Sequence, residues 1–220
     1  MIIVVGAEKG GVGKTLIATN IAALAASEGV EVCLMDTDPQ GSASAWARIR
    51  RSQEGLLQFP VVTIPPDPLH ELQTIAPKFD LIVVDIGAQN YRTMEKAAIL
   101  ADMIIVPTGA DQLEAEATLR VCSILKTMDA RHKDGKVPVH ILLNQMPTNP
   151  KSKEAAALRE FFADETYPVF SSELKGRSSW RNSRRAGAAI HEMTGRDADN
   201  KAAAEMRSVY DEIKRIASDE

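Results

Sequence analysis

The sequence has little cysteine, no long hydrophobic run and no excess of positive charge. Its two cysteines, Cys33 and Cys122, have no metal-ligand spacing, so we interpret both as small core residues. The longest apolar runs, such as Ile104–Val106, are far too short to cross a bilayer. Met1 leads directly into a strand-like run with no basic segment before it, which disfavours a secretory signal. We therefore expect a cytoplasmic protein that does not span a membrane.

The charge and length limit the classes of protein further. A formal net charge of −4 excludes a globally basic nucleic-acid binder but not a local basic patch. Domains usually have roughly 100 to 200 residues, so we expect the 220 residues to form a single domain that spans residues 1–220. No metal-ligand spacing occurs among the four histidines, His70, His132, His140 and His191.

Short apolar runs recur along the chain, with helix-like segments between most of them. Val32–Met35 is wholly apolar and ends at Asp36, which is typical of a strand buried on both faces of a parallel sheet. The other strand-like runs are Ile2–Val5, Val61–Ile64, Leu81–Val84, Met103–Val106 and Val139–Leu143. This alternation predicts an α/β fold with a doubly wound, mostly parallel sheet flanked by helices.

Helices are predicted between and after these strands. The first is expected over residues 14–28, because apolar side chains recur there at helical spacing and Gly29 follows where a left-handed cap is favoured. Later helices are predicted over 153–163, 178–187 and 200–217, with a short extended piece at 167–170 and a turn at 65–68. The apolar face of the last helix indicates core packing rather than membrane targeting.

The stretch Glu8–Thr15 follows the first apolar run and opens the first helix. Its glycines let backbone N–H groups turn toward phosphate oxygens, Lys14 supplies a positive charge, and the Thr15 hydroxyl suits a magnesium ion. The ordinary pattern Gly-x-x-x-x-Gly-Lys-Ser/Thr needs a glycine where Glu8 stands, and a second lysine, Lys9, follows at once. The stretch therefore predicts a phosphate-binding loop with an unusual first half.

Carboxylates follow two of the predicted strands. In a parallel doubly wound sheet, ligands bind at the carboxyl ends of the strands. Asp85 is placed like the acidic residue that holds a magnesium shell opposite Thr15, and Asp36 could share that shell through water. Asp38 could orient, or accept a proton from, the water that attacks a terminal phosphate. Taken singly, each aspartate could equally cap a helix or end a strand.

Three motifs together resemble those of the deviant-Walker ParA/MinD ATPases. They are Lys9–Thr15, Asp36–Gln40 and Phe79–Asp85, and they appear in the family's order over nearly the whole chain. Trp46 and the short length most resemble the compact plasmid-partition ParA proteins of the ParF type. The resemblance implies a P-loop ATPase that uses ATP and Mg²⁺.

The resemblance also implies roles for the loop residues. Lys9 would be the signature lysine, which reaches the phosphates bound by the partner subunit of an ATP-sandwiched homodimer. Lys14 would contact the β- and γ-phosphates, and Thr15 would bind magnesium. Leu16 stands where many relatives have a second threonine, so one hydroxyl contact near the α-phosphate is missing. The loop residues implied to bind ATP are Lys9, Gly10, Gly11, Val12, Gly13, Lys14, Thr15 and Leu16.

Outside the loop, the family would place Asp38 at the attacking water and Asn144 near the adenine. Together with Lys9 and Lys14, Asp38 forms the expected catalytic set. The expected magnesium ligands are Thr15, Asp36 and Asp85.

Basic residues crowd a short stretch in the C-terminal part of this acidic chain: Lys175, Arg177, Arg181, Arg184 and Arg185. A solvated face would explain such a run, but arginines and lysines also bind the DNA backbone without reading its sequence. Relatives bind non-specific DNA through basic residues in this region, so we favour DNA binding. A second cluster, Arg48, Arg50 and Arg51, is interpreted as a helix surface or a partner contact.

The resemblance favours a DNA-partition ATPase that is cytoplasmic and associated with the nucleoid. An ATP-bound homodimer would bind non-specific DNA, and a ParB-type centromere-binding partner would stimulate its weak hydrolysis. The chain begins at the first strand, so we expect no N-terminal DNA-binding domain. One alternative is a ParA-like ATPase that positions a protein cargo or a cell-pole component. Another is a metabolic P-loop enzyme, but a cluster-bridging reductase needs exposed cysteines, and Cys33 lies within a predicted strand.

Overall fold

The computed structural model describes residues 1–65 and 67–219, and within them seven strands form one sheet. The strand order is β3-β2-β4-β1-β5-β6-β7, and every neighbouring pair is parallel. The strands are β1 (Ile2–Val5), β2 (Val32–Asp36), β3 (Val61–Thr63), β4 (Leu81–Asp85), β5 (Met103–Thr108), β6 (Val139–Met146) and β7 (Val169–Lys175). The predicted doubly wound α/β fold is confirmed. Pro66, in the turn predicted at 65–68, lies outside the described residues.

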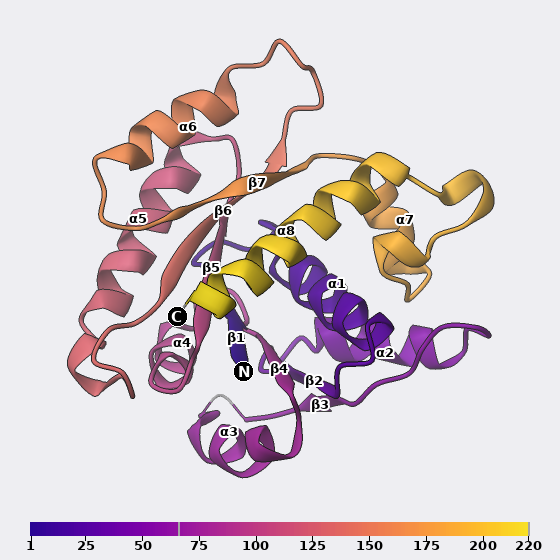
Figure 1. Ribbon diagram of the computed structural model, residues 1–220, viewed down its shortest axis with the longest axis horizontal. Coiled ribbons are helices and arrows are strands. Elements are labelled where there is room, and N and C mark those ends of the chain that lie inside the picture. Colours follow the sequence, from indigo (N-terminus) through magenta and orange to yellow (C-terminus); the bar gives the residue numbers. More distant parts are fainter. Residues whose placement is uncertain (66, 220) are drawn as a thin grey trace.

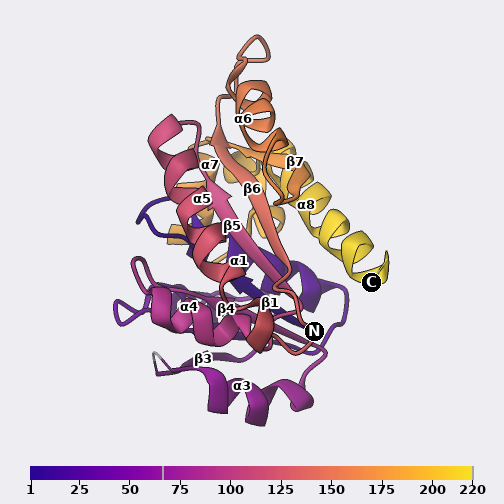
Figure 2. The same ribbon diagram turned by 90° about the vertical axis from the view of Figure 1, so that its left-hand side faces the viewer.

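Helices connect the strands and pack on both faces of the sheet (Figure 1). They are α1 (Lys14–Ser27), α2 (Ser42–Arg51), α3 (Leu69–Ile75), α4 (Tyr91–Ala98), α5 (Gln112–Lys126), α6 (Glu154–Ala163), α7 (Ser179–Arg185) and α8 (Asn200–Asp219). A 3₁₀ turn, η3 (Ile190–Glu192), follows α7. Figure 2 shows α4 and α5 on one side of the strands and α8 on the other.

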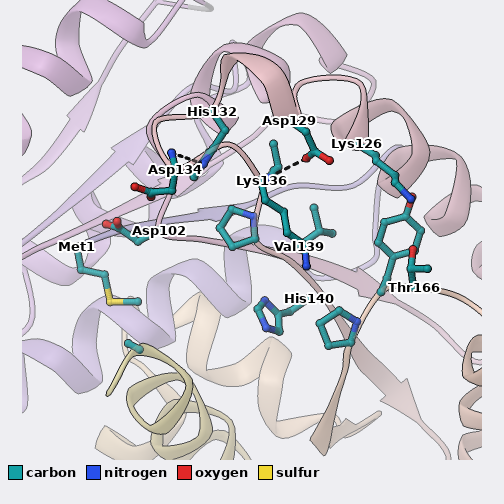
Figure 3. A pocket seen from close by; sticks show the side chains of 15 residues that line it. Met1, Asp102, Lys126, Asp129, His132, Asp134, Lys136, Val139, His140 and Thr166 are labelled. Carbon is teal, nitrogen blue, oxygen red and sulfur yellow. Dashed lines mark hydrogen bonds between the residues drawn. The ribbon is translucent and has the colours of Figure 1, made fainter. Parts of the chain in front are cut away.

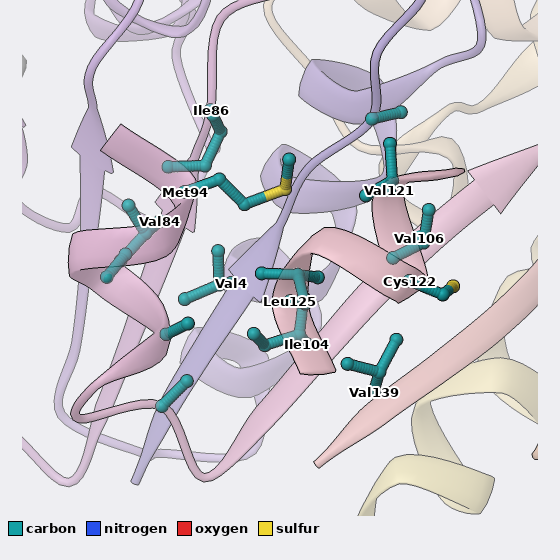
Figure 4. Close-up of a cluster of buried hydrophobic side chains, with 14 of the residues drawn as sticks. Val4, Val84, Ile86, Met94, Ile104, Val106, Val121, Cys122, Leu125 and Val139 are labelled. Carbon is teal, nitrogen blue, oxygen red and sulfur yellow. The ribbon is translucent and has the colours of Figure 1, made fainter. Parts of the chain in front are cut away.

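The sheet separates two hydrophobic cores because successive side chains of a strand point to opposite faces. In β1, Ile2 and Val4 face one core, and Ile3 and Val5 face the other. The first core packs the sheet against α4, α5 and α6, and Figure 4 shows side chains of the strands converging there with those of α4 and α5. The second core packs the sheet against α1, α7 and α8.

The two cysteines and the C-terminal helix agree with the sequence analysis. Cys33 and Cys122 are buried thiols without a disulfide, and burial raises their pKa to about 11 and about 12. Met206, Val209 and Ile213 of α8 pack into the second core. Among the described residues, no helix combines the length and apolar character that a membrane crossing requires.

The position predicted for Arg50, on a helix surface or in a partner contact, is wrong. Only 2% of Arg50 is exposed, and its guanidinium forms a bidentate ion pair with Glu192 of η3, with Nη–Oε distances of 2.6 and 2.7 Å. It also lies over the rings of Trp46 and Phe59, about 5 Å from each centroid. Arg48 and Arg51, its neighbours in sequence, are exposed.

The edge strand β7 is longer than the extended piece predicted at 167–170 and has backbone groups bonded to side chains. The N–H groups of Ser171 and Ser172 donate to the buried Glu212 carboxylate of α8 at 2.7 and 2.8 Å. Arg159 of α6 donates to the carbonyls of Phe170 and Ser171 at 2.5 and 2.9 Å. Side chains of two helices therefore satisfy polar groups along this strand.

Candidate nucleotide-binding site

The register of the sheet brings the predicted site residues together at the carboxyl ends of the strands. Val5 lies opposite Asp85, and Asp36 lies opposite Asp85 on the other side. The loop after β1 therefore begins beside both aspartates. Thr108 pairs with Leu143, which places Asn144 at the same ends of the strands. All of these strands are parallel, so their carboxyl ends meet where ligands bind in such sheets.

The loop between β1 and α1 has the form expected of a phosphate cradle. Gly13 has a φ of 92°, a left-handed conformation, and directly precedes α1. The first N–H groups of a helix have no intrahelical partner, and the helix dipole favours an anion there. The Lys14 ammonium donates to the Lys9 carbonyl at 2.8 Å. Burial lowers the pKa of Lys14, while the charges of Asp85 and Asp38 oppose that change.

Two amide side chains from the end of β6 clamp this loop. The Nδ2 of Asn144 donates to the Val12 carbonyl at 2.7 Å, and the Nε2 of Gln145 donates to the Gly11 carbonyl at 2.6 Å. A Cβ on Gly13 would lie 2.3 Å from Asn144 Nδ2, so only glycine permits this approach. Gln145 has a φ of 58°, which is uncommon for a residue with a side chain. Asn144 is thus beside the loop, and its contact with adenine stays a prediction.

Thr15 and Asp85 form the pair expected of a magnesium site. The Thr15 hydroxyl donates to Asp85 Oδ2 at 2.6 Å, and Asp85 Oδ1 is buried without a hydrogen-bond partner among residues 1–65 and 67–219. Burial raises the pKa of Asp85 to about 7, the Thr15 hydrogen bond opposes the rise, and the charge of Asp36 adds to it. An unsatisfied carboxylate oxygen beside a hydroxyl fits the oxygen ligands that Mg²⁺ prefers. The residues present therefore fit a magnesium ion.

Asp36 and Asp38 organise the loop between β2 and α2. The Oδ1 of Asp36 accepts from the Asp38 N–H at 3.1 Å, and its Oδ2 accepts from the Ser44 N–H at 2.8 Å. Asp36 thus holds the start of α2, and a water-mediated magnesium contact stays a prediction. Asp38 is half-buried, and its Oδ1 accepts from the Gln40 N–H at 2.9 Å. The hydrogen bond to Gln40 fixes the position of the Asp38 carboxylate at the site.

Glu8, at the position of the missing glycine, contacts two other elements. A hydrogen bond from Tyr91 of α4 holds the pKa of Glu8 below its usual range, although burial opposes that effect. Its Oε2 lies 3.4 Å from Nε of Arg120 of α5. The next residue, Lys9, is half-buried, and its ammonium has no ion pair within the described part of the chain. Glu8 therefore ties the loop to α4 and α5, whereas the Lys9 ammonium has no carboxylate partner in the described part of the chain.

The basic stretch divides into two parts. Lys175 pairs with Glu173 at 2.5 Å, and Arg177 pairs with Glu205 at 2.6 Å, so nearby carboxylates already offset both charges. The other three cations lie on α7, are exposed and form no ion pair with any described residue; they are Arg181, Arg184 and Arg185. The α7 arginines are thus the part of the predicted DNA-binding set best able to meet phosphates.

A cavity of about 920 Å³ lies at the amino ends of the strands, opposite the candidate nucleotide site and near the start of β6 (Figure 3). Its lining includes Lys126, His132 and Lys136, and none of the residues predicted to bind nucleotide. In the described part of the chain, no three His, Cys, Asp or Glu side chains gather closely enough to hold a metal. Magnesium at Thr15 and Asp85 would therefore take its other ligands from phosphates and water.

Three side chains at or near the site have no role assigned from the sequence: Gln145, Tyr91 and Arg120. The Gln145 amide follows Asn144 directly at a strand end, so two adjacent amides after an apolar run were a usable signal. Tyr91 and Arg120 left none, because only the fold brings them to Glu8.

Comparison with known proteins gives a consistent family. Curated relatives are two proteins named maintenance of carboxysome distribution protein A. That of Halothiobacillus neapolitanus is 29% identical over 213 residues, or 96% of this chain and 92% of the relative. That of Gloeobacter kilaueensis is 30% identical over 210 residues, covering 94% and 91%. Protein ParA of Rhizobium radiobacter is 21% identical over 213 residues, covering 95% and 93%. These relatives support the family, and not its plasmid-partition branch in particular.

Solved structures show the same fold. Apo McdA of Cyanothece has a TM-score of 0.68 at 15% identity, covering 94% of this chain and 98% of that one. MinD of Pyrococcus horikoshii OT3, complexed with Mg-ADP, has a TM-score of 0.73 at 17% identity, covering 98% and 96%. A model of the CobQ/CobB/MinD/ParA nucleotide-binding domain matches residues 3–180. With the loop, its second lysine and the strand-end aspartates on one edge, the chain belongs to this family and is a deviant-Walker ATPase of the ParA/MinD type.

Proposed function

We propose that this protein is a ParA-type ATPase that positions a large protein assembly along DNA. The observation that carries the proposal is the similarity to two carboxysome distribution proteins over more than nine-tenths of this chain. The cargo would be an assembly of the carboxysome kind, contacted through an adaptor protein. DNA partition, which the sequence analysis favoured, becomes the second candidate.

The site supports ATP hydrolysis by positioned charges. On binding the β- and γ-phosphates, Lys14 would exchange its hydrogen bond to the Lys9 carbonyl for phosphate oxygens. Thr15 and Asp85 would hold magnesium, which neutralises charge on the phosphates. Asp38 would orient the attacking water. The exchange by Lys14 would free the Lys9 carbonyl, so nucleotide binding would reshape the segment that carries the second lysine.

Lys9 supports a cycle that depends on a homodimer. Its ammonium has no ion pair among the described residues, whereas Glu8 beside it is anchored to α4 and α5. A cation supplied by a second subunit would stabilise negative charge on the transferring phosphoryl group. Hydrolysis would then require two copies of the chain, each completing the other's site.

The α7 arginines support non-specific DNA binding. Three exposed guanidiniums that have no carboxylate partner among the described residues can contact phosphates, and each contact releases counterions, so the affinity should fall steeply with salt. Lys175 and Arg177 would contribute less because Glu173 and Glu205 already pair with them. The protein would be associated with the nucleoid through this surface.

Partition of DNA remains a second candidate because protein ParA of Rhizobium radiobacter is also similar over 95% of this chain. The two functions use the same ATP switch and differ in the partner. A partition system would use a ParB-type protein that binds a centromere sequence. A positioning system would use an adaptor that binds the protein assembly.

A mobility shift on random-sequence DNA tests the DNA step, with ATP, ADP and no nucleotide. We expect ATP-dependent binding that Arg184→Ala/Arg185→Ala weakens at least tenfold. The matched control is Lys126→Ala/Arg131→Ala, which removes the same charge from exposed residues elsewhere and should bind normally. Binding that ignores nucleotide would contradict the proposal. Binding equally weakened by the control would contradict the assignment to α7.

The partner decides between the two functions. Affinity capture with the ATP-bound protein, followed by hydrolysis assays with each captured protein, should yield a partner that stimulates turnover. The proposal expects this partner to bind a protein assembly and to show no preference for any DNA sequence. A stimulating partner that protects one defined DNA site would favour partition instead.

A further inference from the structure

The buried Arg50–Glu192 pair joins two elements that lie far apart in the sequence. Besides its two bonds to Glu192, the Arg50 guanidinium donates to the Leu57 carbonyl at 2.7 and 2.9 Å and to the Gly187 carbonyl at 3.2 Å. The pair thus connects α2 to the segment that directly follows α7. Every N–H direction of the guanidinium fork is used within this contact or beside it.

The near end of α2 is attached to the candidate nucleotide site. The Asp36 carboxylate accepts from the Ser44 N–H in the first turn of α2 at 2.8 Å. The Gly41 N–H, just before α2, donates to the Asp38 carbonyl at 2.8 Å. The helix has 10 residues and is therefore about 15 Å long. A movement of the Asp36–Asp38 loop would carry the whole helix with it.

The far end of α2 is packed directly on the segment after α7. Gly187 has a φ of 64°, and a Cβ there would lie 2.4 Å from the Arg50 backbone nitrogen. The Trp46 indole N–H also points to the Ala188 carbonyl at 3.4 Å. Backbone meets backbone at this contact, so α2 and the end of α7 have little room to move independently. The three exposed arginines of α7 lie within six residues before Gly187.

We propose that Arg50 is a positioning residue that, through Glu192, links the Asp36–Asp38 loop to the α7 arginines and so makes DNA affinity depend on the bound nucleotide. The inference rests on the proposed function, because it assumes that α7 binds DNA in the ATP state. Because Arg50 is only 2% exposed, it would contact neither nucleotide nor DNA directly. It acts by fixing where α7 lies relative to α2.

The chemistry of the pair favours a positioning role over a purely stabilising one. The free energy lost when two charges are removed from water offsets much of the free energy gained from their attraction. An apolar contact of the same size would therefore stabilise the fold to an equal degree. A bidentate arginine–carboxylate pair, however, fixes both distance and orientation. It would transmit a small rotation of α2 to α7, where an apolar contact could slide.

Two variants test the link in different ways. Glu192→Gln keeps the size of the side chain but removes the charge and one acceptor oxygen facing Arg50. Gly187→Ala leaves every charge in place and pushes the α7 end away from α2. The control is Asp67→Asn, which breaks the exposed Asp67–Lys96 ion pair beside α3. Each substitution is made in the whole 220-residue chain, and the variants are compared at a temperature well below their melting points.

The readout is the ratio of DNA dissociation constants without nucleotide and with a non-hydrolysable ATP analogue, measured on random-sequence duplex. Each test variant should retain nucleotide affinity within about twofold, while the ratio falls at least tenfold toward one, as lost coupling requires. Asp67→Asn should keep the wild-type ratio. By reciprocity, DNA should tighten binding of the analogue in wild type by the same factor and lose that effect in the variants.

A ratio that stays at the wild-type value in Glu192→Gln would overturn the inference and leave the proposed function intact. The same holds if nucleotide affinity and melting temperature fall while the ratio is unchanged, since that is the mark of a merely structural pair. Should Gly187→Ala not fold, Glu192→Gln decides alone. Failure of the proposed function appears instead in the wild type, as DNA binding that ignores nucleotide, and would overturn both.

Discussion

Replacing Asn144 by alanine tests whether this side chain acts on the loop or on the base. Only 3% of Asn144 is exposed, and its Nδ2 is bonded to the Val12 carbonyl at 2.7 Å. Asn144→Ala leaves that buried carbonyl without its donor, which costs about 1–3 kcal/mol. For a domain of 220 residues, a change of 1 kcal/mol shifts the melting temperature by roughly 2–4 °C, so we expect a fall of roughly 2–12 °C.

The nucleotide affinity carries the sharper part of this prediction. If the Asn144–Val12 hydrogen bond orders the loop before a ligand binds, a variant without it must order the loop during binding. Each phosphate ligand would then bind less favourably, and about 1.4 kcal/mol of such a cost lowers its affinity tenfold. Affinities for ATP and for tripolyphosphate, measured by calorimetry, should therefore fall by the same factor. Gln145→Ala, which removes the exposed donor to Gly11, should have a smaller effect on both.

A different pattern would refute this reasoning. If Asn144→Ala weakens ATP binding while tripolyphosphate binds as in wild type, the side chain acts on adenine and not on the loop. An unchanged melting temperature would show that the Val12 carbonyl finds another donor, and that the clamp has no part in stability.

The remaining predictions concern the buried pair, the hydrolysis roles and the pH dependence of stability. In denaturant titrations, Arg50→Met should lose at most about 3–5 kcal/mol, because it leaves the largely enclosed Glu192 carboxylate with the Ala189 N–H but without its cation. Arg50→Met/Glu192→Leu should regain much of that loss, and a single-variant loss below about 1 kcal/mol would contradict the geometry. Asp38→Ala should bind ATP and dimerise but lose turnover in a phosphate-release assay, and normal turnover would refute its role. Lys9→Ala should bind nucleotide as a monomer yet hydrolyse poorly, and mixing it with wild type should show whether the lysine acts across the dimer. Burial favours a raised pKa for Glu212, but hydrogen bonds from β7 outweigh burial and hold the pKa below its usual range. The contribution of Glu212 to stability is therefore present above about pH 4.5 and is lost at lower pH. Glu212→Gln should reduce the fall of the melting temperature at acid pH, and an unchanged fall would contradict this role of Glu212.

Six of the seven strands could be predicted because each contains a run that is mostly apolar. Except in β3, these runs are almost wholly buried, so they have one simple interpretation. β7 was predicted only as a short extended piece. Its sequence mixes Ser171, Ser172 and Glu173 with apolar residues, because helix side chains and not a second neighbouring strand meet part of its backbone.

The site could be predicted as far as strand ends determine it. Asp36 and Asp85 end apolar runs, Thr15 follows the glycine-rich loop after another, and a parallel sheet gathers these positions at the carboxyl ends of its strands. What spacing could not show is pairing over long separations. Arg50 has exposed arginines on either side in the sequence, while its partner Glu192 is 142 positions away. The same limit applies to Arg177, whose carboxylate partner Glu205 belongs to another element.

The side chains that cover β7 also restrict how copies of this protein can join. A sheet can grow across molecules only if its edge offers backbone groups that are free to pair with a new strand. On β7, the Ser171 and Ser172 N–H groups are occupied by Glu212, and neighbouring carbonyls are occupied by Arg159. A strand from a second copy would have to displace a buried carboxylate and a guanidinium first. Self-assembly through the β7 edge is therefore opposed, which leaves β3 as the edge of the sheet that a strand from a second copy could meet.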